Sequence, residues 1–487
     1  MAEKAARIQP IAAAPCGVYW VQNSCATPVS ITQTLLSLPA GMLLAGAVLL
    51  GLAGTAHAAC LDEEKLESLP SAAAADAGTA PAATDPRRSL RQLVADALAR
   101  NQGIGAARLL AEAAEQDVGE AEAAKKMQVG LTASVSPWLE GGRGGSGTSL
   151  QARAGINLTQ TLWDGGRGDR LVDWRRQQAE SARLGMLSTQ EQITLAATSM
   201  ALERSRFRMQ AVIYGQNVRK LGCLVQALET IVSADKGRTS ELVQARKQLQ
   251  QAELQQAQSQ SQARQVEARL RRMAGDGLPG TVGMATLLLA VPDLPGVLSA
   301  AERSIDISQL AANARALTEI ARVVEAGNKP QVSLNVGGSA LLASGGGAAS
   351  DARSASLTAG VTLSVPILNP AIAYSSQAAR KRAAAADLQR ADALETRRQR
   401  IVDVHEQAAA AFDRVKRVGL VLRDSDRLRN FTLQQWQQMG RRSLFDVLAA
   451  ETDHYNLRVQ YVNALHDGQQ MNAMLTSLGV GIGAWLQ

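Results

Sequence analysis

The sequence contains one succession of segments twice, and the second copy follows the first at a constant distance. In each copy, apolar and small residues recur at alternating spacings of three and four positions. The first series is Leu242, Ala245, Leu249, Ala252, Gln256, Ser259, Ala263, Val266, Leu270 and Met273, and the second is Val447, Ala450, His454, Leu457, Tyr461, Ala464, Gly468, Met471, Leu475 and Leu478. Each member of the second series stands 205 positions after its counterpart. This spacing is typical of coiled-coil helices, and the preserved phase predicts an internally duplicated fold.

Each copy also contains a junction at which a strand pattern changes into a helix pattern. Residues 152–162 alternate between apolar and polar side chains, as a half-buried strand requires. A bend follows, made of Trp163, Asp164, Gly165 and Gly166, after which helical spacing continues to about residue 234. Residues 361–370 form a related junction before a second long helix.

The two copies predict the same order of elements: helix, strand, strand, long helix, helix. In the first copy we expect helix 87–126, strand 127–135, a Gly/Ser loop at 140–149, the strand before the bend, helix 165–234, a turn at 235–240 and helix 241–274. In the second we expect helix 305–326, a strand from 330, a loop at 344–354, strand 357–367, helix 371–438, a turn at 440–443 and helix 444–478.

These patterns divide the chain into six parts. Residues 1–58 are predicted to be an export signal, because an apolar run at 41–53 precedes the small-x-small site Ala56-His57-Ala58. An uncleaved anchor is the alternative. Cys60 could carry a lipid, but His57 stands where a lipoprotein signal requires Leu. The remaining parts are expected to be a flexible lead-in at 59–86, a first repeat at 87–274, a linker at 275–303, a second repeat at 304–480 and a C-terminal tail at 481–487.

The element lengths predict a mostly α-helical architecture with a small membrane-spanning β share. A helix over 165–234 is about 105 Å long, so helices 87–126 and 241–274 together match it if they stack end to end. The strands have one apolar and one polar face, which fits lipid on one side and water on the other. A soluble two-layer sheet shows the same alternation. Four strands are too few to close a barrel and open edges do not survive in lipid, so we expect a homotrimer with a 12-stranded barrel.

The motifs and their doubled arrangement resemble the TolC-type family of outer-membrane efflux and secretion channels. The matching stretches are 160–166 (QTLWDGG), 329–332 (KPQV), 237–245 (GRTSELVQA), 440–448 (GRRSLFDVL) and 475–479 (LTSLG). The resemblance implies a trimeric tunnel with its barrel in the outer membrane and its helices crossing the periplasm. It also implies two partners: a periplasmic adaptor protein and an inner-membrane transporter of the ABC or RND type. Met127, Asn369-Pro370 and Ala449 depart from the family pattern.

The candidate site residues lie at the turns between long and short helices. Asp446 and Glu241 stand at equivalent places in the two repeats, and three copies of Asp446 would form a carboxylate ring at the periplasmic aperture. An acidic residue in the first turn of a helix is also ordinary dipole matching, so a capping role is the alternative. The residues expected to contact the adaptor or close the tip are Gly237, Arg238, Gly440, Arg441 and Arg442.

The sequence favours transport over chemistry. Its four histidines form no metal-binding spacing and no catalytic group is evident, so we expect no enzyme activity, cofactor or metal. The net charge of +7 is scattered, with no basic block interleaved with aromatics, which disfavours nucleic-acid binding. Type I protein secretion is the favoured function, because Cys60 lacks the signal that many lipidated efflux members carry. Small-molecule efflux and a trimeric coiled-coil surface stalk are the alternatives.

Overall fold

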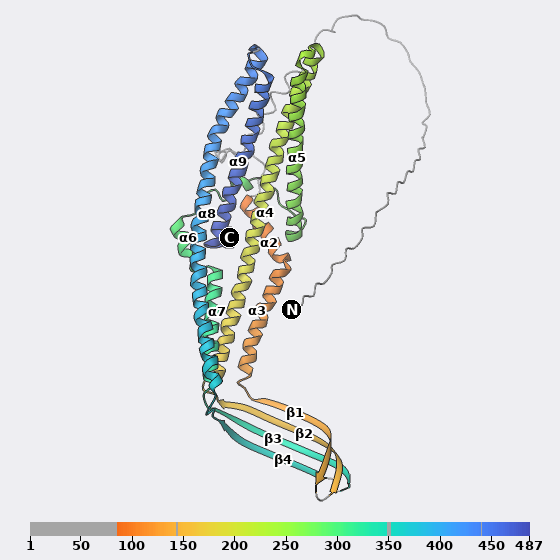
Figure 1. The fold of residues 1–487 in the computed structure, drawn as a ribbon, viewed down its shortest axis with the longest axis vertical. Helices are drawn as coiled ribbons and strands as arrows, with labels where there is room; N and C mark the ends of the chain where they lie inside the picture. The colour runs from red at the N-terminus through yellow and green to blue at the C-terminus, as the bar shows by residue number, and fades with distance from the viewer. Residues whose placement is uncertain (1–84, 143–144, 348–351, 440) are drawn as a thin grey trace, which may run out of the picture. The chain divides into compact units, whose positions relative to one another are not determined.

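The computed structural model describes residues 85–142, 145–347, 352–439 and 441–487. The predicted export signal and nearly all of the predicted lead-in therefore lie outside the described residues. Figure 1 shows the duplicated unit, which is described from residue 85 onward.

The described elements follow the predicted order in both copies. The first copy consists of α2 (Pro86–Arg100), α3 (Gln102–Ala123), β1 (Gln128–Gly142), β2 (Gly145–Trp163), α4 (Arg167–Ala234), the short 3-10 helix η2 (Lys236–Arg238) and α5 (Thr239–Ala274). The second copy consists of α7 (Ile305–Ala326), β3 (Gln331–Gly347), β4 (Ala352–Ser364), α8 (Pro370–Met439) and α9 (Leu444–Leu478). Between and after them lie η3 (Met284–Thr286), α6 (Leu294–Ala301) and α10 (Ile482–Leu486).

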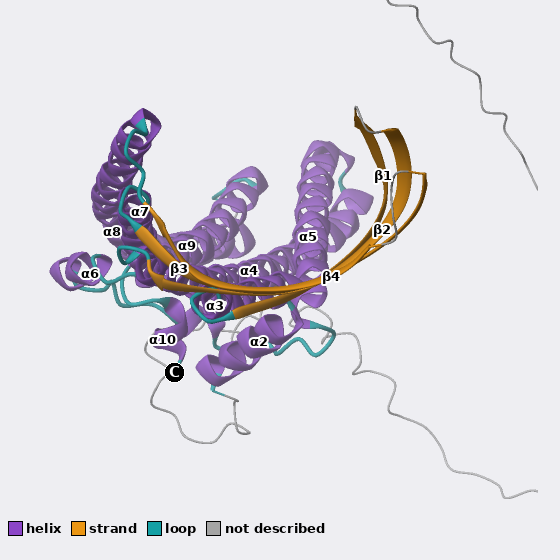
Figure 2. Ribbon diagram, turned by 90° about the horizontal axis from the view of Figure 1, so that it is seen from below, coloured by secondary structure: helices purple, strands orange, loops and turns teal. Residues whose placement is uncertain are grey.

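Each long helix packs against two shorter helices, as the length argument predicted. Helix α4 contacts α3 towards the sheet and α5 towards the opposite end, and α8 contacts α7 and α9 in the same way (Figure 1). The copies meet along α4, which also contacts α7 and α9. The helices therefore form a row with α8 at one edge and α5 at the other. Figure 2 shows this row from below, looking along the helices.

The predicted heptad residues supply the seams of this row. Ala245 and Leu270 of α5 and Leu475 of α9 are completely buried. Gly468 of α9 lies so close to the ring of Phe412 that a Cβ there would come within 2.9 Å of it. Small residues in the seam thus allow α8 and α9 to approach closely, which the mixture of small and large heptad residues indicated.

The described strands form a four-stranded antiparallel sheet in the order β1-β2-β3-β4. In its register, Leu131 pairs with Ile156, and Leu334 pairs with Val361, so apolar side chains share one face. Polar residues such as Thr132, Asn157 and Thr358 share the other face. The two-faced sheet was predicted, and a mostly helical fold with these strands is confirmed.

The strands contain 15, 19, 17 and 13 residues, so they are longer than the predicted strands, such as 127–135 and 357–367. The prediction placed loops at 140–149 and 344–354, whereas the ladder continues through most of both segments. The alternation of apolar and polar side chains disappears where Gly and Ser accumulate, so these segments were predicted to be loops. The hydrogen bonds between strands come from the backbone and do not depend on that alternation.

The predicted helix 87–126 is interrupted at Asn101. This residue has an extended backbone, with φ −73° and ψ 113°, and its side chain accepts a hydrogen bond from the Gly103 amide. It therefore ends α2 and caps α3. Helical periodicity continues across the break, which is why the single-helix prediction was wrong here.

Residues 275–303, expected to be a linker, contain η3 and α6 and pack into the protein interior. Met284 and Leu287 are buried in the same apolar cluster as Leu90 and Leu93 of α2. Val297 of α6 is buried against Leu475 of α9. The prolines and glycines that suggested a linker are thus part of a compact, irregular segment.

The last residues, expected to be a tail, form α10. Glu191 of α4 accepts hydrogen bonds from the backbone amides of Ile482 and Gly483, and Ile482 and Leu486 are buried. Among the residues that the structure describes, no helix has both the length and the apolar character needed to cross a membrane.

Candidate functional site

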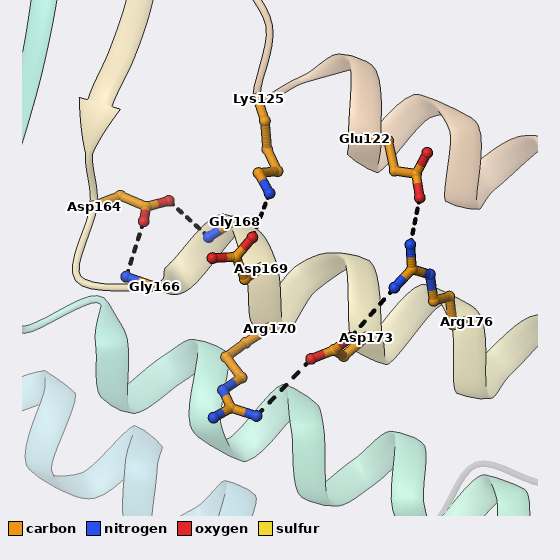
Figure 3. Close-up of polar contacts among 9 residues, drawn as sticks. All are labelled: Glu122, Lys125, Asp164, Gly166, Gly168, Asp169, Arg170, Asp173 and Arg176. Carbon is orange, nitrogen blue, oxygen red and sulfur yellow. Dashed lines mark hydrogen bonds and ion pairs between the residues drawn. The ribbon is translucent and has the colours of Figure 1, made fainter.

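The bend between β2 and α4 is built around Asp164 (Figure 3). Its two carboxylate oxygens accept hydrogen bonds from the backbone amides of Gly166, at 3.0 Å, and Gly168, at 2.6 Å. Gly165 and Gly166 have φ angles of +68° and +85°, which are readily adopted only by glycine. Asp164 therefore caps α4 across two glycines, and Trp163 ends the strand half-exposed. All four predicted bend residues lie together.

Ion pairs that sequence reasoning missed hold the helices around this bend (Figure 3). Lys125 pairs with Asp169, and Arg176 pairs with Glu122 at 2.6 Å, which joins the end of α3 to α4. The hydrogen bond and charge of Asp169 raise the pKa of Lys125. Arg170 pairs with Glu319 of α7 at 3.3 Å. The sequence shows the charged residues in the first turns of α4, but it does not show which residues they pair with, because the partners are distant in sequence.

Lys329 connects the bend to the second repeat. Its Nζ donates a hydrogen bond to the Gly165 carbonyl oxygen at 3.0 Å, just before β3 begins. The second bend differs, as Asn369-Pro370 suggested, because Pro370 begins α8 directly and the Ile372 amide bonds to the Asn369 carbonyl at 3.2 Å. Only the first bend thus has the aspartate cap among the described residues.

The two turns between long and short helices lie together at the end opposite the sheet (Figure 1). One apolar cluster joins them, with Leu228 and Leu242 from the first repeat against Leu444 and Leu448 from the second. In the first turn, Asp235 accepts a hydrogen bond from the Gly237 amide at 2.9 Å, and Arg238 is exposed. In the second, Arg442 donates to the Gln435 side chain at 3.2 Å. Gly440 lies outside the described residues.

Asp446 forms a capping box with Ser443. The Asp446 amide donates to the Ser443 hydroxyl at 3.3 Å, and the Ser443 amide donates to the Asp446 carboxylate at 3.2 Å. Asp446 therefore caps α9, as the alternative interpretation predicted. Its side chain is also exposed. Glu241 differs from its counterpart, because its Oε2 is buried and has no hydrogen-bond partner in the part of the chain that the structure describes.

Substitutions at the two bend glycines should have unequal costs. Alanine at either position adopts an unfavourable left-handed conformation, but a Cβ at Gly165 would also lie 2.5–2.6 Å from Lys329 carbons, whereas none lies within 4 Å at Gly166. We expect Gly165→Ala to be less stable than Gly166→Ala by about 1 kcal/mol, because Lys329 must move. Thermal unfolding of both variants in detergent measures this difference. Equal midpoints would show that Lys329 does not constrain the bend.

The described residues hold no cluster of three or more His, Cys, Asp or Glu side chains placed to bind a metal ion. The site is thus a set of structural junctions and charged turns at the two ends of long helices. Such an arrangement can position a sheet and an aperture.

Comparison with known proteins supports this interpretation. Residues 93–276, which include most of the first repeat, match the family model described as "Outer membrane efflux protein". No match to a curated protein sequence reaches significance.

Solved structures of outer-membrane channels have the same fold. CusC has 18% sequence identity and a TM-score of 0.71, with 80% of this chain and 92% of that chain covered. VceC of Vibrio cholerae has 16% identity and a TM-score of 0.68, covering 81% and 96%. The CmeC channel of Campylobacter jejuni has 14% identity and a TM-score of 0.67, covering 80% and 85%. At these identities the likeness establishes the fold.

Proposed function

We propose that this chain belongs to the outer membrane efflux protein family, the TolC-type channels, whose model matches residues 93–276, and that three copies of it form the exit duct of a tripartite exporter. The family's members are channels rather than enzymes, and they span the outer membrane and extend into the periplasm. The observation that carries the proposal is a two-faced sheet with open edges, attached directly to a row of helices that also has open edges.

The sheet's edges require a partner if the sheet lies in a membrane. Strands β1 and β4 each have one neighbour within the described sheet, so each leaves one side of its backbone without strand pairing. Unpaired backbone groups are too costly to leave in lipid. Pairing β1 of one copy with β4 of the next would satisfy both edges, and three copies would give twelve strands, within the range of known membrane barrels.

The helical row has matching apolar edges. Large apolar side chains are exposed on α8 at one edge and on α3 and α5 at the other. These residues are Leu388, Leu420, Leu428 and Phe431 of α8, Leu109 and Leu110 of α3, and Val243 and Leu254 of α5. Contact between two different surfaces of identical chains generates a ring when the rotation closes. The helical and sheet edges thus favour the same head-to-tail assembly.

The two faces of the sheet match the two sides of a barrel wall. Leu131 and Leu357 expose 81% and 82% of their surface on the apolar face. A sheet in water would bury such side chains under another layer. We assign the apolar face to lipid and the polar face to a water-filled lumen. A surface stalk would need one set of strands at a chain end, whereas both hairpins here are internal to a repeat.

The helical turns are proposed to be the periplasmic mouth and the contact surface for the adaptor. Arg441 and Arg442 are exposed beside Asp446, and Gly237 and Arg238 occupy the equivalent turn of the first repeat. The partners inferred are a periplasmic adaptor and an inner-membrane transporter of the ABC or RND type. The exposed charged turns support contact with another protein at this end.

Two cargo classes fit this duct. Type I protein secretion remains the proposal that the sequence favours. The similarity of residues 93–276 to outer membrane efflux proteins favours export of small molecules instead. Deleting the gene and measuring both secreted proteins and drug sensitivity separates them. Loss of a secreted protein supports secretion, and increased drug sensitivity alone supports efflux. No change in either phenotype would contradict the exporter role.

Asp446 is proposed to line the aperture as well as cap α9. We expect Asp446→Ala to lower cation selectivity in planar bilayers, because three carboxylates near one axis attract cations. Loss of the cap should cost about 1 kcal/mol. Ser443→Ala is a matched control, because it weakens the same capping box without removing a charge. Equal selectivity in both variants, with equally reduced stability, would leave Asp446 as a cap alone.

A further inference from the structure

The polar face of the sheet carries a single charge along its middle part. Arg153 lies near the centre of β2, paired with Ser134 of β1 and Leu341 of β3. Its side chain is exposed. The neighbouring pairs on this face contribute Thr132, Gln151 and Ser339, so no carboxylate lies beside it in the described sheet.

Other charged residues of the strands are far from Arg153 or on the other face. Glu140 pairs with Gly147 near the hairpin end, roughly 20 Å along the strand from Arg153. Asp164 at the bend is roughly 35 Å away in the opposite direction. Both distances exceed the screening length of about 8 Å at physiological salt. Arg353 pairs with Leu342 and therefore belongs to the apolar face.

The position of Arg153 is consistent with the assignment of this face to water. The alternation of β2 directs its guanidinium away from Ile156 and Leu158, which lie on the face assigned to lipid. In a ring of three copies, three Arg153 side chains would lie at one height on the lumen wall. On this face each Arg153 is surrounded by Thr132, Ser134, Gln151 and Ser339, and by one large apolar residue, Leu341.

We infer that Arg153 forms a cationic ring inside the barrel that favours anionic solutes, including the carboxylate groups of exported compounds, in the outer part of the duct. This inference rests on the proposed trimeric barrel. Rings of Arg or Lys select anions in other pores. Cargo would thus meet the carboxylates proposed at the periplasmic mouth first and the guanidinium groups of Arg153 later.

Reversal potentials across planar bilayers with a KCl gradient test the inference. Arg153→Gln keeps side-chain length but removes the charge, so we expect the ratio of K⁺ to Cl⁻ permeability to rise roughly threefold at 0.1 M salt. The effect should increase at 0.01 M, where the screening length is about 30 Å. Arg153→Lys should retain the wild-type ratio.

Arg353→Gln is the matched control, because it removes the same charge from the opposite face of the same sheet. It should leave selectivity unchanged. The Arg153 ring is contradicted if Arg153→Gln channels conduct with wild-type selectivity at low salt, or if Arg353→Gln produces the same shift. Either result leaves the proposed channel function intact. If the wild-type chain forms no conducting trimer, the proposed function itself fails.

Discussion

Replacing Glu267 with Gln is expected to lower the free energy of unfolding by about 3 kcal/mol, because it removes one partner of a buried ion pair. Glu267 of α5 and Arg204 of α4 are joined at 3.1 Å, with only 14% and 8% of their side chains exposed. Arg204 also donates to the Pro279 carbonyl at 2.6 Å. Without the carboxylate, a guanidinium that stays protonated remains buried without its counter-charge. Thermal unfolding at fixed protein concentration measures the loss.

A second pair between the same two helices provides the control. Glu229 and Arg246 are 2.7 Å apart, but 46% and 54% of their side chains are exposed. Exposed pairs contribute at most about 1 kcal/mol, so Glu229→Gln should change stability little. Similar losses in Glu229→Gln and Glu267→Gln would contradict the role of burial.

The same pair has a pH dependence of defined sign. Burial alone would raise the pKa of Glu267, but the hydrogen bond from Arg204 and the charges of Arg208 and Arg204 outweigh it and hold the pKa below its usual value. Its stabilising contribution is therefore complete above the unfolded-state pKa of about 4.3. It is lost as the pH falls through the lower folded-state pKa. The difference between wild type and Glu267→Gln should shrink accordingly below about pH 4.

The second large effect is expected at two carboxamides of α9. Gln469 donates to the carbonyls of Met284 and Leu287, at 3.1 and 2.5 Å, and Asn472 donates to those of Leu288 and Ala290, at 2.7 and 3.1 Å. Both side chains are completely buried. Replacing both with Leu keeps the approximate volume but leaves four carbonyls without these donors, at a cost of about 4 kcal/mol in total.

Two measurements distinguish this effect from a general loss of packing. Limited proteolysis should cut the double variant faster within residues 279–290, because the carboxamides hold that segment against α9. Asn456→Leu, an exposed substitution on the same helix, should stay within about 0.5 kcal/mol of wild type. Wild-type stability and unchanged cleavage in the double variant would show that the segment is held by its apolar residues alone.

These carboxamides also show where sequence reasoning ended. Heptad spacing located α5 and α9, because burial repeats along a helix with a fixed period. It could not predict that Gln469 and Asn472, between the heptad positions, bind a segment about 185 residues earlier. Leu288 there has a φ of +55°, rare for a non-glycine residue. Irregular backbone held by distant side chains has no periodic signal.

The candidate site shows the same division between local and distant effects. Asp164, Gly165 and Gly166 were predictable as a bend because their roles depend on adjacent residues. The contacts from Lys329 to Gly165 and from Arg170 to Glu319 cross the two repeats. Only the folded chain brings those residues together. The Asn101 break is local, but its cap falls within a continuous apolar pattern and was therefore missed.

The most direct test of the central claim is the mass of the purified, detergent-solubilised protein with its β-structure intact. The open edges of the sheet and of the helical row require neighbouring copies, and three copies give the proposed twelve-stranded barrel. We therefore expect three chains per particle. Cross-linking between β1 of one chain and β4 of the next should yield the same stoichiometry. A stable monomer that retains the sheet would contradict the barrel, the duct and the proposed trimer together.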